Sequence, residues 1–212
     1  MYLFSRRARL APGNTQAAMA WATEITEKVN KITGLNVGLY AQTFSPKVGT
    51  LSWSTFLSDL ATLESANDKL LVDDAYVSMV DAGAKFAPGG ADDVLLQIIH
   101  GAPDPARQVE YVTTVQTVCA SGSLAKGIEL AIEIAQRAEK TLGVPVLVAT
   151  GVTGKYGSVA WISGYANVQE LERSQQALTA DAKFAEFVDQ SVRGVYVDDP
   201  SMTQQLIYRH IA

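Results

Sequence analysis

The chain of 212 residues carries an internal repeat, and this repeat limits the folds that it can adopt. When the sequence is shifted by about half its length, glycine, tryptophan and apolar positions coincide at the same spacing. The shift is 109 residues in the early part of the copy, 108 around the first repeated tryptophan and 110 at its end, as short loop insertions would produce. The clearest aligned pairs are Trp53 with Trp161, Gly34 with Gly143, and His100 with His210. Self-similarity of this kind predicts two copies of one structural unit.

Each copy predicts the same order of elements. Alternating apolar residues predict strands, and apolar residues at three- and four-residue spacing predict helices. In the first copy the predicted strands are 3–10, 35–44, 50–57 and 94–100, and the helices are 16–31, 59–70 and 73–85. In the second copy the strands are 110–119, 144–150, 157–165 and 203–211, and the helices are 123–141, 168–178 and 181–192. The order is βαββαβ in both copies, which is the ferredoxin-like unit.

One such unit has helices on only one face of its sheet, so the other face must be buried against something. A second copy in the same chain supplies that partner. We therefore predict an α+β fold in which two tandem ferredoxin-like βαββαβ repeats pack sheet to sheet as a pseudo-dimeric α/β barrel. The predicted boundaries are 1–101 for the first repeat, 102–109 for a linker and 110–212 for the second repeat.

Charge and composition exclude several classes of function. Seventeen Lys and Arg against 22 Asp and Glu give a net charge of −5, which lacks the basic footprint of a nucleic-acid-binding protein. One cysteine cannot form an internal disulfide or a cysteine-rich zinc site. No apolar run approaches the roughly 18 residues of a membrane helix, and the N-terminus lacks the pattern of a signal peptide. We expect a soluble cytoplasmic protein with no membrane partner.

The segment after each repeated tryptophan resembles the dimeric α/β-barrel superfamily, and within it NIPSNAP-like and antibiotic-biosynthesis-monooxygenase-like domains. In the first copy the resemblance is carried by Trp53, by Leu60-Ala-Thr-Leu63, and by Asp73-Asp74-Ala-Tyr76. In the second copy it is carried by Trp161, Val168-Gln-Glu-Leu171 and Asp181-Ala-Lys-Phe184. The resemblance covers nearly the whole chain as two fused units.

The resemblance implies a small-molecule ligand in the barrel cavity but does not select one reaction. Members of the superfamily include haem-degrading and cofactor-free monooxygenases, lactone isomerases, polyketide cyclases and haem peroxidases. The haem-degrading pattern has an asparagine on the first strand and a histidine on the helix after the tryptophan. Neither residue occurs at those places in this chain.

The aromatic candidates for a ligand site are Trp53 and Trp161, together with the strand tyrosines Tyr40 and Tyr165. The tryptophans would form walls of a cavity, and the tyrosines would present hydroxyl groups to it. The alternative is that the tryptophans fill the core, because a large aromatic side chain on a strand buries much apolar area. The tyrosines would then lie at the rim of a sheet.

The charged and titratable candidates are Arg7, Arg9, His100 and His210. If Arg7 or Arg9 faces the barrel interior, its guanidinium group could bind a ligand carboxylate through two hydrogen bonds; otherwise both are solvated rim residues. His100 or His210 could act as a general base or bind haem iron, or could be an ordinary residue at a strand end. No metal site is predicted, and no cofactor other than this haem alternative.

Three functions follow from these observations. The first is binding of a small apolar or aromatic ligand in the barrel cavity, including cofactor-independent monooxygenase or isomerase activity. The second is a non-enzymatic assembly or interaction protein, with a homo-oligomer as its form, because no acid, base and nucleophile converge in the sequence. The third is a haem-binding protein. No catalytic residue is assigned at this level.

Overall fold

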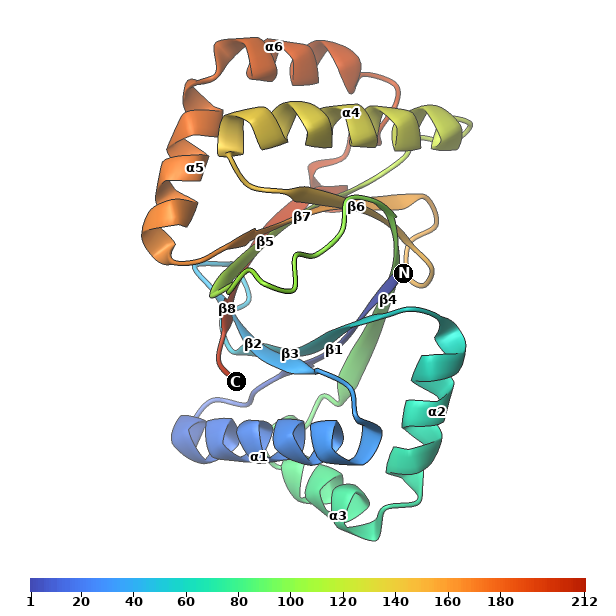
Figure 1. Ribbon diagram of the computed structural model, residues 1–212, viewed down its shortest axis with the longest axis vertical. Helices are drawn as coiled ribbons and strands as arrows, with labels where there is room; N and C mark the ends of the chain where they lie inside the picture. The colour runs from blue at the N-terminus through green and yellow to red at the C-terminus, as the bar shows by residue number, and fades with distance from the viewer. The chain divides into compact units, whose positions relative to one another are not determined.

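The computed structural model describes residues 1–212 and shows eight strands and six α-helices (Figure 1). The first half contains β1 (Tyr2–Arg9), α1 (Thr15–Thr33), β2 (Gly38–Thr43), β3 (Thr50–Leu57), α2 (Leu60–Leu71), α3 (Asp74–Gly83) and β4 (Ala91–His100). The second half contains β5 (Tyr111–Val118), α4 (Leu124–Leu142), β6 (Val146–Gly151), β7 (Ser158–Tyr165), α5 (Val168–Ala180), α6 (Ala182–Ser191), the short 3₁₀-helix η1 (Pro200–Met202) and β8 (Gln204–His210).

The predicted order βαββαβ is confirmed in both halves, with each second helix broken into two. The hydrogen-bonded strand order β1-β3-β2-β8-β5-β7-β6-β4 closes on itself as a barrel. The predicted fold class, a pseudo-dimeric α/β barrel of tandem ferredoxin-like repeats, is therefore confirmed. The sequence did not predict η1, and β4 begins three residues before its predicted start.

The chain divides into two compact units. Each unit includes the end of one strand from the other half of the sequence. The first unit comprises residues 1–95 and 209–212, and the second comprises residues 96–208. In the first unit β3 lies between β1 and β2, and both pairs are antiparallel. In the second unit β7 lies between β5 and β6 in the same way, and β6 also pairs with the end of β4.

The same hydrogen bonds recur at matching positions of the two units. The indole nitrogen of Trp53 lies 3.5 Å from the carbonyl oxygen of Ala22, and the indole nitrogen of Trp161 lies 2.8 Å from that of Ala131. Both tryptophans thus lie on the helix-covered face of their sheets. These shared contacts agree with the repeat in the sequence.

The first helix of each unit ends in the same motif. Gly34 and Gly143 adopt left-handed backbone angles, with φ values of 74° and 70°, which glycine tolerates without a steric penalty. Their N–H groups donate to the carbonyl oxygens of Asn30 and Glu139. The side chains of these two residues then accept hydrogen bonds, of 2.7 and 2.9 Å, from the backbone that leads into the next strand.

The core of the second unit packs α4 against β6 and β7. Its members include Ala131, Ala135, Val148 and Val159, each with at most 1% of its surface exposed. The hydrophobic pattern of α4 places its apolar side chains on one face, so burial of that face fixes the helix on the sheet. The first unit has a smaller cluster around Ala22, Leu39 and Leu51.

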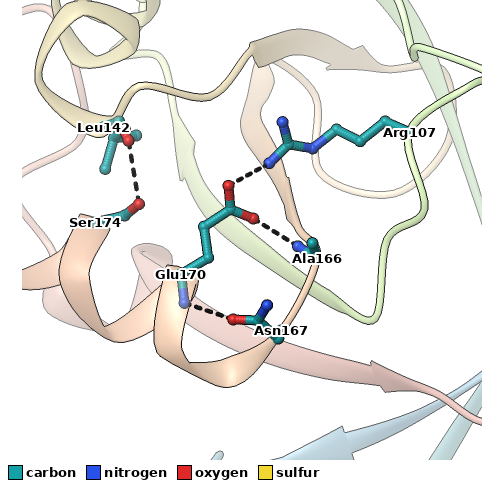
Figure 2. Close-up of polar contacts among 6 residues, drawn as sticks. All are labelled: Arg107, Leu142, Ala166, Asn167, Glu170 and Ser174. Atoms are coloured by element: carbon teal, nitrogen blue, oxygen red, sulfur yellow. Dashed lines mark hydrogen bonds and ion pairs between the residues drawn. The ribbon is translucent and has the colours of Figure 1, made fainter.

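The connecting segment is held to the start of α5 by polar contacts (Figure 2). The Arg107 guanidinium donates to Glu170 at 2.8 Å, and the other carboxylate oxygen of Glu170 accepts from the N–H of Ala166 at 2.6 Å. Asn167 caps the helix by accepting from the N–H of Glu170. Burial raises the pKa of Glu170, but the Ala166 N–H and Arg107 outweigh it and hold the pKa below its usual value.

No helix in the structure has both the length and the apolar character needed to cross a membrane.

Candidate functional site

The first unit contains a cavity of about 470 Å³ between its sheet and its three helices. The floor consists of alternate residues of β1 and β3, and the walls come from α1, α2 and α3. Side chains alternate between the two faces of a strand, which is why Phe4, Arg6 and Ala8 face the cavity together. A volume of this size is in the range of small-molecule sites.

Two tryptophans form an aromatic wall of the cavity. The rings of Trp21 on α1 and Trp53 on β3 meet edge to face, with centroids 5.8 Å apart. The Trp53 indole donates to the hydroxyl of Thr26 at 2.9 Å, and the Trp21 indole donates to the carbonyl of Met79 at 2.8 Å. Since both N–H groups have protein partners, the rings offer a ligand apolar contact rather than hydrogen bonds.

A charged pair gives the cavity one polar end. Arg6 on β1 donates two parallel hydrogen bonds of 2.8 Å to the carboxylate of Asp93 on β4. This hydrogen bonding, with the charge of Asp93 and the nearby Tyr76, outweighs burial and raises the pKa of Arg6. Because the two charges compensate each other, the pair suits a neutral polar group on a ligand better than a free ion.

The matching place in the second unit is occupied by side chains. Tyr196 packs edge-on against Trp161, with centroids 5.9 Å apart, and its hydroxyl donates to the carbonyl of Gly127 at 2.7 Å. Burial raises the pKa of this hydroxyl, and Tyr196 belongs to the core cluster of the unit. Opposite Trp161 on the neighbouring strand stands the apolar Val115, where the first unit has Arg6 opposite Trp53.

In the first unit a small residue, Ala87, stands at the position that corresponds to Tyr196 of the second unit. The N–H of Ala11 bonds to the carbonyl of Phe86, and the N–H of Ala120 bonds in the same way to that of Val195. The next residues, Ala87 and Tyr196, therefore correspond. Ala87 lines the cavity, whereas its counterpart fills the equivalent space.

The residues singled out in the sequence have different surroundings. Trp53 lines the cavity, and Trp161 is packed against the core of the second unit. Arg7 and Arg9 alternate with Arg6 on β1, so they point to the sheet face opposite the cavity.

Tyr40 and His210 come together in the first unit. Their ring centroids lie 5.0 Å apart, and both rings lie over Gly38, where a Cβ atom would crowd them. Burial raises the pKa of Tyr40. Neither residue lines the cavity.

The remaining two candidates belong to the second unit. Tyr165 is fully buried beside Tyr111, Val144 and Leu171, and its hydroxyl has no hydrogen-bond partner. His100 lies at the end of β4, where a register shift places it opposite Val148.

Sequence reasoning missed Trp21, Arg6, Tyr76 and Asp93, which the fold gathers around the cavity. Arg6 could have been found from strand alternation, because it shares a face with Phe4 and lies opposite Trp53. No comparable signal pointed to Trp21, since the repeat aligns it with Leu130 and so gives it no matching aromatic residue.

The cavity lining does not suit a haem held by histidine. No histidine, cysteine or methionine lines it, and Tyr76 is the one residue of the lining that belongs to the usual types of axial ligand of haem iron. No group of three or more histidine, cysteine, aspartate or glutamate residues is placed to hold a metal ion. The cavity is lined instead by apolar and aromatic side chains, with one arginine, two carboxylates, a phenol, two threonines and an asparagine as its polar groups.

No protein-family model matches the sequence, and no curated protein matches it. Solved structures are similar along the whole chain. A candidate monooxygenase from Fusobacterium nucleatum aligns with 100% of this chain and 92% of its own, at 10% identity and a TM-score of 0.72. An anthrone oxidase-like protein aligns with 100% of this chain and 91% of its own, at 11% identity and a TM-score of 0.65.

A candidate chlorite dismutase aligns with 100% of this chain and 96% of its own, at 12% identity and a TM-score of 0.54. A NIPSNAP domain protein from Burkholderia xenovorans covers only 49% of this chain, at a TM-score of 0.43. Identities this low show a shared fold and not a shared reaction. The fold of this chain is that of the dimeric α/β-barrel proteins, as its sequence predicted.

Proposed function

We propose that the first repeat binds a small aromatic or apolar molecule and that the second repeat serves as its structural counterpart. The observation that carries this proposal is the cavity itself, of about 470 Å³, lined mainly by apolar side chains with Trp21 and Trp53 in its wall. A cavity with a few convergent polar groups is the usual form of a ligand site. The proposed partner is thus a small molecule, while self-association stays a prediction from the sequence.

Tryptophan emission provides a direct test, because two of the three tryptophans of the chain line the cavity. In a Trp161→Phe variant every remaining indole borders the site. We expect 1-naphthol to quench this emission saturably, since a ring that enters the cavity must contact one of the two indoles. The matched control replaces Trp21 and Trp53 with phenylalanine and leaves Trp161, whose emission should not respond. Equal quenching in both variants would show that the probe binds elsewhere.

A finer proposal is that the bound molecule is the substrate of a cofactor-independent monooxygenase or isomerase. Similarity of fold to a candidate monooxygenase and to an anthrone oxidase-like protein supports this choice. Within the cavity the carboxylates of Asp93 and Asp81 are the groups able to accept a proton from a substrate. Asp93 already has Arg6 as its partner, so the pair could orient a substrate hydroxyl or carbonyl group.

Oxygen uptake with anthrone as the substrate tests this finer proposal. We expect the purified protein to accelerate oxygen consumption, and Asp93→Asn to lower kcat by about 100-fold, the lower end of the range for losing a general base. Asp92→Asn is the matched control, because Asp92 is the adjacent residue on β4 and does not line the cavity. Ligand binding without any oxygen uptake would leave a binding protein and remove the monooxygenase.

A further inference from the structure

Helix α3 is attached to the first unit by little apolar surface. Its only buried residue is Gly83, while Val77 and Val80 are 38% and 42% exposed. Val72, in the corner that leads into the helix, is 81% exposed. A helix with so few buried side chains opens at low cost in free energy.

The matching helix of the second unit is attached in a different way. α6 has no fully buried residue either, but Phe184, Phe187 and Val188, with Val192 just after the helix, are partly buried against the core cluster of that unit. Under the repeat, Tyr76, Met79 and Val80 of α3 take the places of the first three. Tyr76 and Val80 line the cavity instead of packing on a core cluster, so α3 borders a cavity where α6 borders a filled core.

Polar contacts hold α3 in place instead. The indole N–H of Trp21 donates to the carbonyl of Met79 at 2.8 Å. Lys28 on α1 forms an ion pair of 3.1 Å with Asp73, the residue that caps the helix. Each of these bonds can be exchanged for one with water when the helix moves, so neither adds a large barrier.

Trp21 connects the helix to the ligand cavity. The ring lies against the backbone of Gly83, so closely that a Cβ atom at that position would overlap it. The same ring lines the cavity. A molecule packed against Trp21 would therefore fix the surface on which α3 rests.

We propose that α3 is a movable cover of the cavity, with Trp21 as its latch. The proposal rests on the proposed function, because it treats the cavity as a ligand site. In the open state the Trp21–Met79 hydrogen bond is broken and the cavity is exposed to solvent along α3. A ligand that contacts Trp21 binds the closed state better and so shifts the population toward it.

Hydrogen exchange of the unliganded protein, followed by mass spectrometry, tests the cover. We expect the amides of α3 to exchange at least about tenfold faster than those of α6, equivalent to a difference of about 1.4 kcal/mol in the free energy of opening. Trp21→Phe keeps the ring and removes the donor, and should speed exchange in α3 by roughly fivefold, the equivalent of one hydrogen bond. Trp161→Phe makes the same change in the second unit and should leave α3 unaltered. Added 1-naphthol should slow exchange in α3.

The outcomes distinguish failure of the proposed cover from failure of the proposed ligand site. Exchange in α3 as slow as in α6, with normal quenching by 1-naphthol, would overturn the cover and leave the ligand site standing. Faster exchange in α1 and α3 alike in Trp21→Phe would also overturn it, since that result means general destabilisation. Absence of quenching in Trp161→Phe would overturn the proposed function itself.

Discussion

Replacing Trp21 with leucine and Ala87 with tyrosine should lower the affinity of the first repeat for 1-naphthol by about 100-fold, equivalent to about 2.7 kcal/mol. The double variant transplants Leu130 and Tyr196 of the second repeat to their matching positions. The new tyrosine should take the edge-on place against Trp53 and fill the space that Ala87 leaves open. Quenching titrations of Trp53 would measure the loss.

The single variant Trp21→Leu is the control for this transplantation. It shares the loss of the indole and of the hydrogen bond to Met79, but it leaves the cavity open. The affinity difference between the double and single variants therefore reports the tyrosine alone. If both bind equally well, the cavity between the sheet and the helices is not where the ligand lies.

Replacing Trp161 with alanine should cost about 3 kcal/mol of unfolding free energy, the lower end of the range for truncating an aromatic residue in a core, because Trp161 is only partly buried. Trp161 packs on the core cluster of the second unit, touches Tyr196 edge-on and donates to the Ala131 carbonyl. Removing it leaves a hole among side chains that are already close-packed. Chemical denaturation followed by circular dichroism would measure the change.

Trp53→Ala is the matched substitution in the first unit, and it should cost about 1–2 kcal/mol less, because part of the Trp53 surface already borders a cavity and loses fewer contacts. The comparison uses two residues at equivalent positions of one chain. Equal losses would indicate that the two repeats are equally well packed and that the cavity is filled in solution.

Much of the fold could be predicted because its signals are local or repeated. Helix and strand periodicity gave nearly every element, and the matched tryptophans and glycines gave the duplication. Gly34 and Gly143 mark helix ends by the same left-handed geometry in both copies. Because each unit leaves one face of its sheet uncovered, it needs a partner to bury that face. The duplication supplies the partner and so predicts the barrel.

The residues of the cavity were harder to predict from the sequence, because the repeat reveals only the residues that the two copies share. The cavity depends on what they do not share: Ala87 against Tyr196, and Arg6 against Val115. Such differences carry no signal until the equivalent positions are superposed in space. Arg7 and Arg9 lie on the opposite face of β1 from Arg6, and strand alternation alone does not indicate which face borders this cavity.

The last residues described, 209–212, belong to the first unit, where Ala212 and Ile211 hydrogen-bond to the backbone of Leu39. During synthesis the ribosome releases the N-terminal part of a chain first. Here the sheet beneath the proposed site cannot gain its final strand until residue 212 has emerged. The half of the molecule that is made first thus gains its final strand only after the second half has been translated.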